Sequence, residues 1–264
     1  MMNALLSLTD NLAEMIGREV RRAFSEVKRF LYFQRAILKT IHYVPMHPSF
    51  LVEQLYIIGI TSIPLVLITA TFTGMVFAWQ MAYQLAGLAP DIYIGVAVGK
   101  SVMVELGPVL VSMVMCGRIG AAMCAELGTM AVTEQFDALK CLNLSPHRYL
   151  MAPRLVASVI MLPVLTIIAS LISILSGWIV TYIGIGVPIE IFMNGVRMFY
   201  ADWDMIVGLI KSAVSGYIIA SFATYFGYYT TNGAEGVGRS TKASVVASMT
   251  SVLIAAFLLS ELLL

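Results

Sequence analysis

Five long apolar stretches limit how this chain can fold. They cover residues 55–83, 92–117, 150–183, 204–228 and 242–264. A helix of about 20 apolar residues crosses the ~30 Å hydrocarbon core of a bilayer, and each stretch reaches that length. Charged residues make up only 12% of the chain, against about 25% in soluble domains. The pattern predicts an all-α integral membrane protein with five transmembrane helices in residues 49–264.

Residues 1–48 precede these stretches and have a different pattern. Apolar side chains recur every three or four residues, which places them on one face of a helix: Leu5, Leu8, Leu12, Ile16, Val20, Phe24, Val27 and Leu31. Cations lie mostly on the other face: Arg18, Arg21, Arg22, Lys28 and Arg29. We expect an amphipathic helix at the membrane interface, its cations toward anionic headgroups. The alternative is an ordinary surface helix of a soluble domain.

The segment between the second and third stretches, residues 117–148, is too polar to cross a membrane. It is rich in helix formers, so we expect a short helix or helical pair against the membrane surface, at about residues 119–142. Thirteen Lys and Arg residues lie in 1–50, 117–154 and 229–242, and the loops at 84–91 and 184–203 hold one. The positive-inside rule then places the N-terminus in the cytosol and the C-terminus outside.

The letters "GKS" at residues 99–101 resemble the end of a phosphate-binding loop. Such a loop needs G-x-x-x-x-G-K-[ST] between a strand and a helix. Ile94 occupies the first glycine position, and the run lies in an apolar stretch, so we exclude a nucleotide site here. Gly95 and Gly99 instead form a G-x-x-x-G face on which another helix can pack closely.

Three charged side chains, Lys100, Glu105 and Lys211, interrupt the apolar stretches. On one helix Lys100 and Glu105 would lie about 140° apart, outside the i,i+3 and i,i+4 contacts, and Lys100 can snorkel toward headgroups. An intramembrane carboxylate usually faces a cavity or a partner. Glu105, just before the helix-bending Pro108, and Lys211 on another stretch therefore predict either a structural salt bridge or a shared polar pocket.

The sequence carries no catalytic or metal-binding pattern. The histidines His42, His47 and His147 have no metal-ligand spacing, and the three cysteines have no C-x-x-C spacing. The serines lack a G-x-S-x-G elbow. With no nucleic-acid motif either, we predict a protein that is not an enzyme, holds no metal or cofactor, and binds no nucleic acid.

Residues 105–139 read ELGPVLVSMVMCGRIGAAMCAELGTMAVTEQFDAL. This run resembles the MlaE-type permeases (the YrbE family), whose pattern is roughly E-L-G-P-V, then G-R-x-G-[AS]-A, then E-[IL]-G-x-M-x-x-T-E-Q. The matching positions are Glu105, Leu106, Gly107, Pro108, Val109, Gly117, Arg118, Gly120, Ala122, Glu126, Gly128, Met130, Thr133, Glu134 and Gln135. The resemblance continues through "SPHRYLMAPRLVASVIMLPVLT" and "LIKSAVSGY", and it is much weaker in the first 45 residues.

The resemblance implies the membrane subunit of an Mla/Mce phospholipid ABC transport system. Such permeases are homodimers in the bacterial inner membrane. A separate cytosolic P-loop ATPase hydrolyses ATP, and a periplasmic MCE-domain protein exchanges phospholipid with the permease to maintain outer-membrane lipid asymmetry. A lipid would bind between the two protomers.

The resemblance also implies roles for residues. Glu105 and Lys211 would lie at the polar part of the lipid pocket, with Leu106 among its lining residues. Some relatives have an arginine where this chain has Val104, so Lys100 is a candidate substitute. The side chains at 75, 79 and 83 share a helix face and would line the acyl-chain cavity or simply pack helices: Met75, Trp79 and Tyr83. The 119–142 segment would be the coupling helix that enters the ATPase with its polar side chains: Glu126, Thr133, Glu134, Gln135 and Asp137.

Two other functions stay open from the sequence. A secondary transporter driven by an ion gradient would use Glu105 as its protonated group and need no ATPase. A membrane scaffold that only recruits a lipid-binding partner would tolerate loss of both Glu105 and Lys211.

Overall fold

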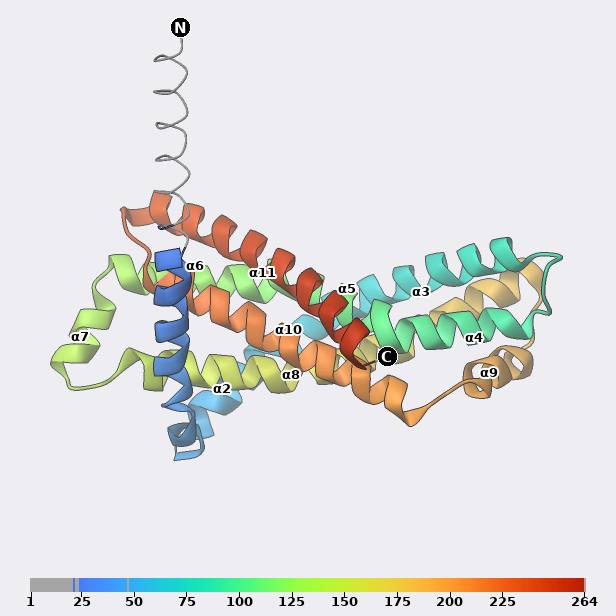
Figure 1. Ribbon diagram of the computed structural model, residues 1–264, viewed down its shortest axis with the longest axis horizontal. Helices are drawn as coiled ribbons and strands as arrows, with labels where there is room; N and C mark the ends of the chain where they lie inside the picture. The colour runs from blue at the N-terminus through green and yellow to red at the C-terminus, as the bar shows by residue number, and fades with distance from the viewer. Residues whose placement is uncertain (1–20, 22–23, 47, 264) are drawn as a thin grey trace, which may run out of the picture.

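The computed structural model describes residues 21, 24–46 and 48–263 (Figure 1). All regular elements in this part of the chain are helices. They include five helical spans that are long and apolar enough to cross a membrane, at Pro48–Leu85, Ile92–Val132, His147–Ile185, Asp202–Tyr228 and Gly233–Leu263. The predicted all-α membrane fold with five spans is confirmed, and each helix extends past at least one of its predicted ends.

The first span consists of α2 (Pro48–Ile58), a short 3-10 turn η2 (Ile60–Ser62) and α3 (Ile63–Leu85). Pro64 lies at the start of α3, where its missing N–H costs little. The third span begins with a π-helical turn, η5 (His147–Met151), and continues as α8 (Ala152–Ile185). Because α8 contacts α2, α3, α5 and α10, it is the central helix of the bundle.

The second span is one rod of five helical segments. They are α4 (Ile92–Ser101), the π-helical η3 (Val102–Leu106), α5 (Gly107–Met115), the π-helical η4 (Cys116–Gly120) and α6 (Ala121–Val132). The sequence predicted an end at residue 117, because hydropathy falls there. The backbone nonetheless stays helical, since a helix satisfies its own backbone groups in lipid and in water alike.

The predicted 119–142 coupling helix is therefore two helices. Its first half, α6, continues the second span, and its second half is a separate helix, α7 (Gln135–Cys141). Between them Glu134 adopts a left-handed backbone conformation, with φ of 59°. A non-glycine residue in that region of φ cannot continue an α-helix, so the chain turns at this point.

The remaining elements are α9 (Ile189–Met198), α10 (Asp202–Tyr228) and α11 (Gly233–Leu263). Helix α11 begins nine residues before the predicted fifth span, so Arg239 and Lys242 belong to a helix and not to a loop. Helix α9 packs on α4 where a Cβ on Gly95 would lie 2.1 Å from the carbonyl oxygen of Phe192. The close helix packing predicted for the Gly95 face is thus confirmed.

Residues 24–38 form a helical segment that crosses the long axis of the bundle (Figure 1). It packs on α10 through Phe30, which stacks on Phe222 at 4.9 Å, and through Gln34, whose amide nitrogen donates to the carbonyl of Ser221 at 3.2 Å. Three residues of the predicted apolar face point away from the bundle: Phe24, Val27 and Leu31. Those in residues 1–20 lie outside the described part of the chain.

Candidate functional site

Lys211 of α10 and Glu105 of η3 form a salt bridge inside the bundle. The lysine side chain is only 1% exposed, whereas the glutamate side chain is 44% exposed. Of the two interpretations that the sequence left open, the salt bridge is present. The glutamate side chain is also partly exposed, whereas both members of a fully enclosed structural pair would be buried.

Backbone packing brings Lys211 to this position. A Cβ on Gly208 would lie 2.3 Å from the carbonyl oxygen of Met103, so α10 approaches η3 closely at this glycine. Lys211 follows Gly208 by three residues and lies on the same side of α10. Its Nζ donates to the carbonyl oxygen of Val104 at 3.1 Å. In an α-helix that carbonyl would accept from residue 108, which is Pro108 and has no N–H.

The last span completes the site with Ser260 of α11. Lys211 Nζ donates to Ser260 Oγ at 2.8 Å, and this hydroxyl oxygen lies 3.2 Å from Glu105 Oε2. The ammonium group thus has a carboxylate, a carbonyl and a hydroxyl around it, one acceptor for each of its three protons. A buried charged group is stabilised when it is paired and hydrogen-bonded in this way.

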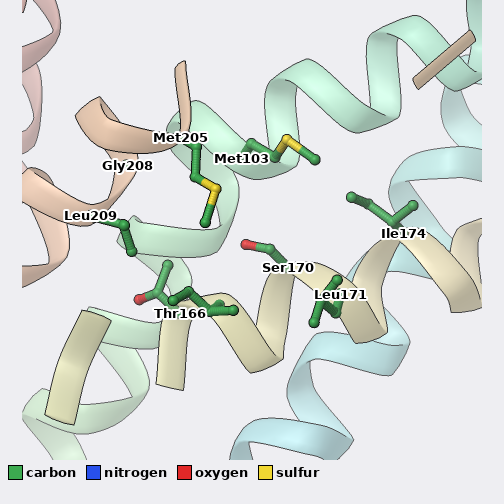
Figure 2. Close-up of a pocket in the computed structure, with 9 residues that line it drawn as sticks. Met103, Thr166, Ser170, Leu171, Ile174, Met205, Gly208 and Leu209 are labelled. Carbon is green, nitrogen blue, oxygen red and sulfur yellow. The ribbon is translucent and has the colours of Figure 1, made fainter. Parts of the chain in front are cut away.

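A mainly apolar cavity lies beside η3, between α8 and α10 (Figure 2). It encloses about 430 Å³ including its mouth, and Met103, Leu171, Ile174 and Met205 are among its lining side chains. The buried hydroxyl of Thr166, also in its wall, has no hydrogen-bond partner among the described residues. An apolar cavity with such a lining suits hydrocarbon and not a polar solute.

The other predicted lipid-contacting side chains are not gathered around that cavity. Trp79 packs on α8, where a Cβ on Gly184 would lie 2.1 Å from the indole ring. Trp79 and Tyr83 line a separate apolar pocket at the α3 end, and Leu106 lines a third one against α3 and α8. Met75 is partly buried on α3. Helix packing accounts for one side of Trp79, and an acyl-chain role for these residues stays a prediction.

Lys100, the candidate substitute for an arginine, has another partner. Its Nζ lies 3.5 Å from the carboxylate of Asp204 at the start of α10. The lysine side chain is more than half exposed, and the aspartate is buried. As the sequence predicted, Lys100 does not pair with Glu105.

Among the polar residues assigned to ATPase coupling, Glu126 pairs within the chain. Its carboxylate accepts from Arg154 Nη2 at 2.6 Å and ties α6 to the start of α8. The arginine is buried, and the glutamate is half-exposed. The pair therefore gives the buried guanidinium a counter-charge at the point where α6 meets the start of α8.

The other four coupling candidates, Thr133, Glu134, Gln135 and Asp137, lie at the turn before α7 and on α7, and all are exposed. In contrast, Phe136 is buried, with its ring 5.1 Å from that of Tyr228. Asp137 accepts from Lys140 Nζ at 2.8 Å, and this hydrogen bond raises the pKa of Lys140. One aromatic side chain therefore anchors a short helix whose polar side chains face outward.

Ser260, Asp204 and Arg154 were not singled out by sequence reasoning. Serine is common in membrane helices, and Ser260 gave no signal of its own. Asp204 and Arg154 lie at the ends of apolar stretches, where charges are expected at the membrane surface. Only the fold shows that Asp204 lies near Lys100 and that Arg154 pairs with Glu126. The described residues contain no group of His, Cys, Asp and Glu that could hold a metal ion.

The similarity to known proteins includes all three residues of the cluster, Glu105, Lys211 and Ser260. A family model described as "Permease MlaE" matches residues 51–262. A protein of Rickettsia bellii named "Probable ABC transporter permease protein" is 35% identical over 252 residues, which is 96% of this chain and 97% of that protein. A protein of the same descriptive name from Synechocystis is 41% identical over 211 residues, 80% of each chain.

A plant protein is also similar. The Arabidopsis thaliana chloroplast protein named "TRIGALACTOSYLDIACYLGLYCEROL 1" is 38% identical over 209 residues, which is 79% of this chain and 60% of that protein. All these similarities cover most of the chain, so they concern the bundle as a whole and not an isolated motif.

Proposed function

The chain belongs to the MlaE permease family of ABC transporter permeases, and from this we propose that it moves phospholipids as the membrane subunit of an Mla/Mce system. It works as a homodimer in the bacterial inner membrane. Separate P-loop ATPase subunits bind on the cytosolic side, and an MCE-domain protein receives or delivers lipid on the periplasmic side. The activity maintains outer-membrane lipid asymmetry.

The observation that carries this proposal is the Lys211–Glu105–Ser260 cluster, where residues of the second, fourth and fifth spans meet. Charges within a membrane are costly, and they typically mark a substrate path. Here a fully buried ammonium group contacts a glutamate whose side chain is 44% exposed. An exposed carboxylate can accept hydrogen bonds from a hydroxyl or ammonium group of a phospholipid headgroup, and the lysine supplies the opposite charge close by.

The apolar cavity beside η3 and the plant relative support a lipid substrate. The cavity wall offers hydrocarbon surface a few residues from Glu105, so a polar headgroup and an acyl chain would find matching surroundings at one depth of the bundle. The plant relative is named after trigalactosyldiacylglycerol, a lipid. A phospholipid has both a polar headgroup and acyl chains, whereas a simple ion has no apolar part.

Energy enters mechanically in this proposal. The exposed polar face around α7 docks in the ATPase, and α6 is continuous with the helical rod that carries Glu105. Glu126 and Glu105 are 21 residues apart, about 32 Å along a helix. A displacement at the α7 end therefore reaches the lipid site through a rod and not through a flexible linker. The excess of cations at the α7 end supports a cytosolic location for that end.

The test is lipid mass spectrometry of the purified chain. The wild-type protein should retain phospholipid and co-purify with a P-loop ATPase, and Glu105→Gln or Lys211→Met should reduce the retained lipid severalfold. Lys242→Met, which removes an exposed lysine on α11, is the control. Proton-dependent transport by the isolated chain would instead indicate a secondary transporter. Normal lipid retention and transport in both site variants would indicate a scaffold.

A further inference from the structure

A second cavity lies where the helical segment 24–38 crosses α10, at the α7 end of the bundle. It is open to the outside and encloses about 830 Å³ including its mouth. Two cations and three tyrosines are among its lining residues: Lys28, Arg29, Tyr32, Tyr228 and Tyr229. The family model begins at residue 51, so it does not cover the 24–38 segment. No step of the transport proposal uses the cavity.

The charge of this cavity is positive, and none of the described residues that line it carries a carboxylate. Among the residues that the structure describes, neither Lys28 nor Arg29 takes part in a salt bridge. Residues 21–46 contain six Lys and Arg and a single acidic residue, Glu26. Glu26 accepts a hydrogen bond from Tyr225 Oη at 2.9 Å and does not line the cavity.

The arginine is held in a defined orientation. Its guanidinium carbon lies 3.8 Å from the ring centroid of Tyr229, a cation–π contact. A guanidinium that rests on an aromatic ring keeps its N–H edges free, and these edges match two oxygens of a phosphate. The Lys28 ammonium group lies 5.9 Å over Tyr32 and adds a second, more mobile charge. Phosphate recognition commonly uses this combination of a planar fork and a point charge.

The cavity is distinct from the Lys211 site. Tyr228 follows Lys211 by 17 residues on α10, which is about 26 Å along the helix. The cavity therefore lies near one end of the spans, at the level of headgroups, and at the end richest in cations. Anionic phospholipids are attracted to such basic surfaces, and basic pockets beside membrane helices bind their headgroups.

We propose that this cavity binds the phosphate of an anionic phospholipid that is not transported. Arg29 would hold two phosphate oxygens, and Lys28 would approach a third. The bound lipid would fasten the 24–38 segment to α10. It would also stabilise α7, because the cavity wall residue Tyr228 contacts Phe136 at 5.1 Å and has the Lys140 ammonium group 5.9 Å above its ring. This site goes beyond the proposed transport function and does not depend on it.

The experiment uses the full chain in neutral detergent, titrated with phosphatidylglycerol or with phosphatidylcholine of the same acyl chains. Native mass spectrometry measures bound lipid, and thermal unfolding measures stabilisation. We expect phosphatidylglycerol to bind more tightly and to raise the Tm. Arg29→Ala should weaken this binding at least tenfold to a hundredfold, because the loss of even one of its two charge-assisted hydrogen bonds has that effect. Arg239→Ala, which removes an exposed arginine at the same end, is the matched control.

Two further measurements are needed. One compares the lipid with soluble phosphate compounds, and the other provides a second variant in case the first does not fold. Inorganic phosphate and glycerol 3-phosphate should stabilise the protein far less than the lipid; equal stabilisation would overturn the lipid assignment. If Arg29→Ala does not fold, Lys28→Gln replaces it, because Lys28 is exposed. This variant should also bind less phosphatidylglycerol and lose part of the rise in Tm. Equal binding of both lipids, or equal losses in Arg29→Ala and Arg239→Ala, would overturn the site. Lys211→Met should leave phosphatidylglycerol binding at this cavity unchanged. A failure of the cavity proposal can therefore be told apart from a failure of the transport proposal.

Discussion

The side-chain amine of Lys211 contacts the carboxylate of Glu105 although 106 residues separate them in the chain. The two partners are unequal, since the lysine is enclosed and the glutamate is half-exposed. The lysine also donates to the carbonyl of Val104, a residue of the same π-helical turn as Glu105. Pro108 follows this turn and has no N–H to donate to that carbonyl.

This inequality predicts different costs for removing each charge. Glu105→Gln leaves a buried ammonium group without a counter-charge, and breaking a buried pair in this way costs about 3–5 kcal/mol. Lys211→Met replaces the lysine with an apolar side chain of similar length and leaves a carboxylate that solvent or a headgroup can reach. We therefore expect the larger loss of stability from Glu105→Gln, measured by unfolding in detergent.

The double variant Glu105→Gln/Lys211→Met is the control for this prediction. It removes both charges, so it should be more stable than Glu105→Gln alone, and both single variants should lose transport. Equal destabilisation by the two single variants, with additive effects in the double variant, would contradict an energetic coupling between these side chains.

Ser260 should matter less than either charge and still be measurable. Ser260→Ala removes the hydroxyl that accepts from Lys211 at 2.8 Å, and a hydrogen bond to a charged group contributes about 1.5–3 kcal/mol. We expect a lower Tm and weaker lipid retention. Thr250→Ala on the same helix is the control, because its hydroxyl donates only to the carbonyl of Val246. A Ser260→Ala protein that matches this control in both measurements would show that the hydroxyl adds nothing.

The sequence was sufficient to predict the class of fold and the charged residues of the site, and insufficient for the ends and contacts of the helices. High hydropathy marks the part of a helix that lipid covers, so it predicted the second span correctly. It does not mark where the helix ends, and the helix continues to Val132. The turn at Glu134 depends on a backbone conformation that no composition signals. Opposite charges on two spans suggested the Glu105–Lys211 pair, whereas the neutral Ser260 became visible only through its place in the fold.

The close approach of α10 to η3 predicts a specific defect in a glycine variant. A Cβ on Gly208 would lie 2.3 Å from the carbonyl oxygen of Met103, so Gly208→Ala should push the helices apart and lengthen the Lys211–Glu105 contact. We expect a loss of about 1–3 kcal/mol, as for other overpacked cores. Gly238→Ala on α11 meets no atom within 4 Å and is the control. If both variants unfold at the same temperature, the packing at Gly208 is looser than described.

Charge reversal on and beside α7 should separate ATP hydrolysis from transport. Glu134 and Asp137 are exposed, and α7 is fixed to the bundle by the buried Phe136, so Glu134→Lys and Asp137→Lys should leave the Tm of the isolated permease nearly unchanged. Within the assembled transporter they reverse the charge offered to the ATPase, and a like-charge contact of this kind costs several kcal/mol. We expect reduced co-purification of the ATPase, or ATP hydrolysis without lipid movement.

Glu190→Lys on α9, which reverses an exposed charge at the opposite end of the bundle, is the control and should leave ATPase binding intact. Variants at 134 and 137 that co-purify with the ATPase and transport lipid normally would refute the assignment of this surface to coupling.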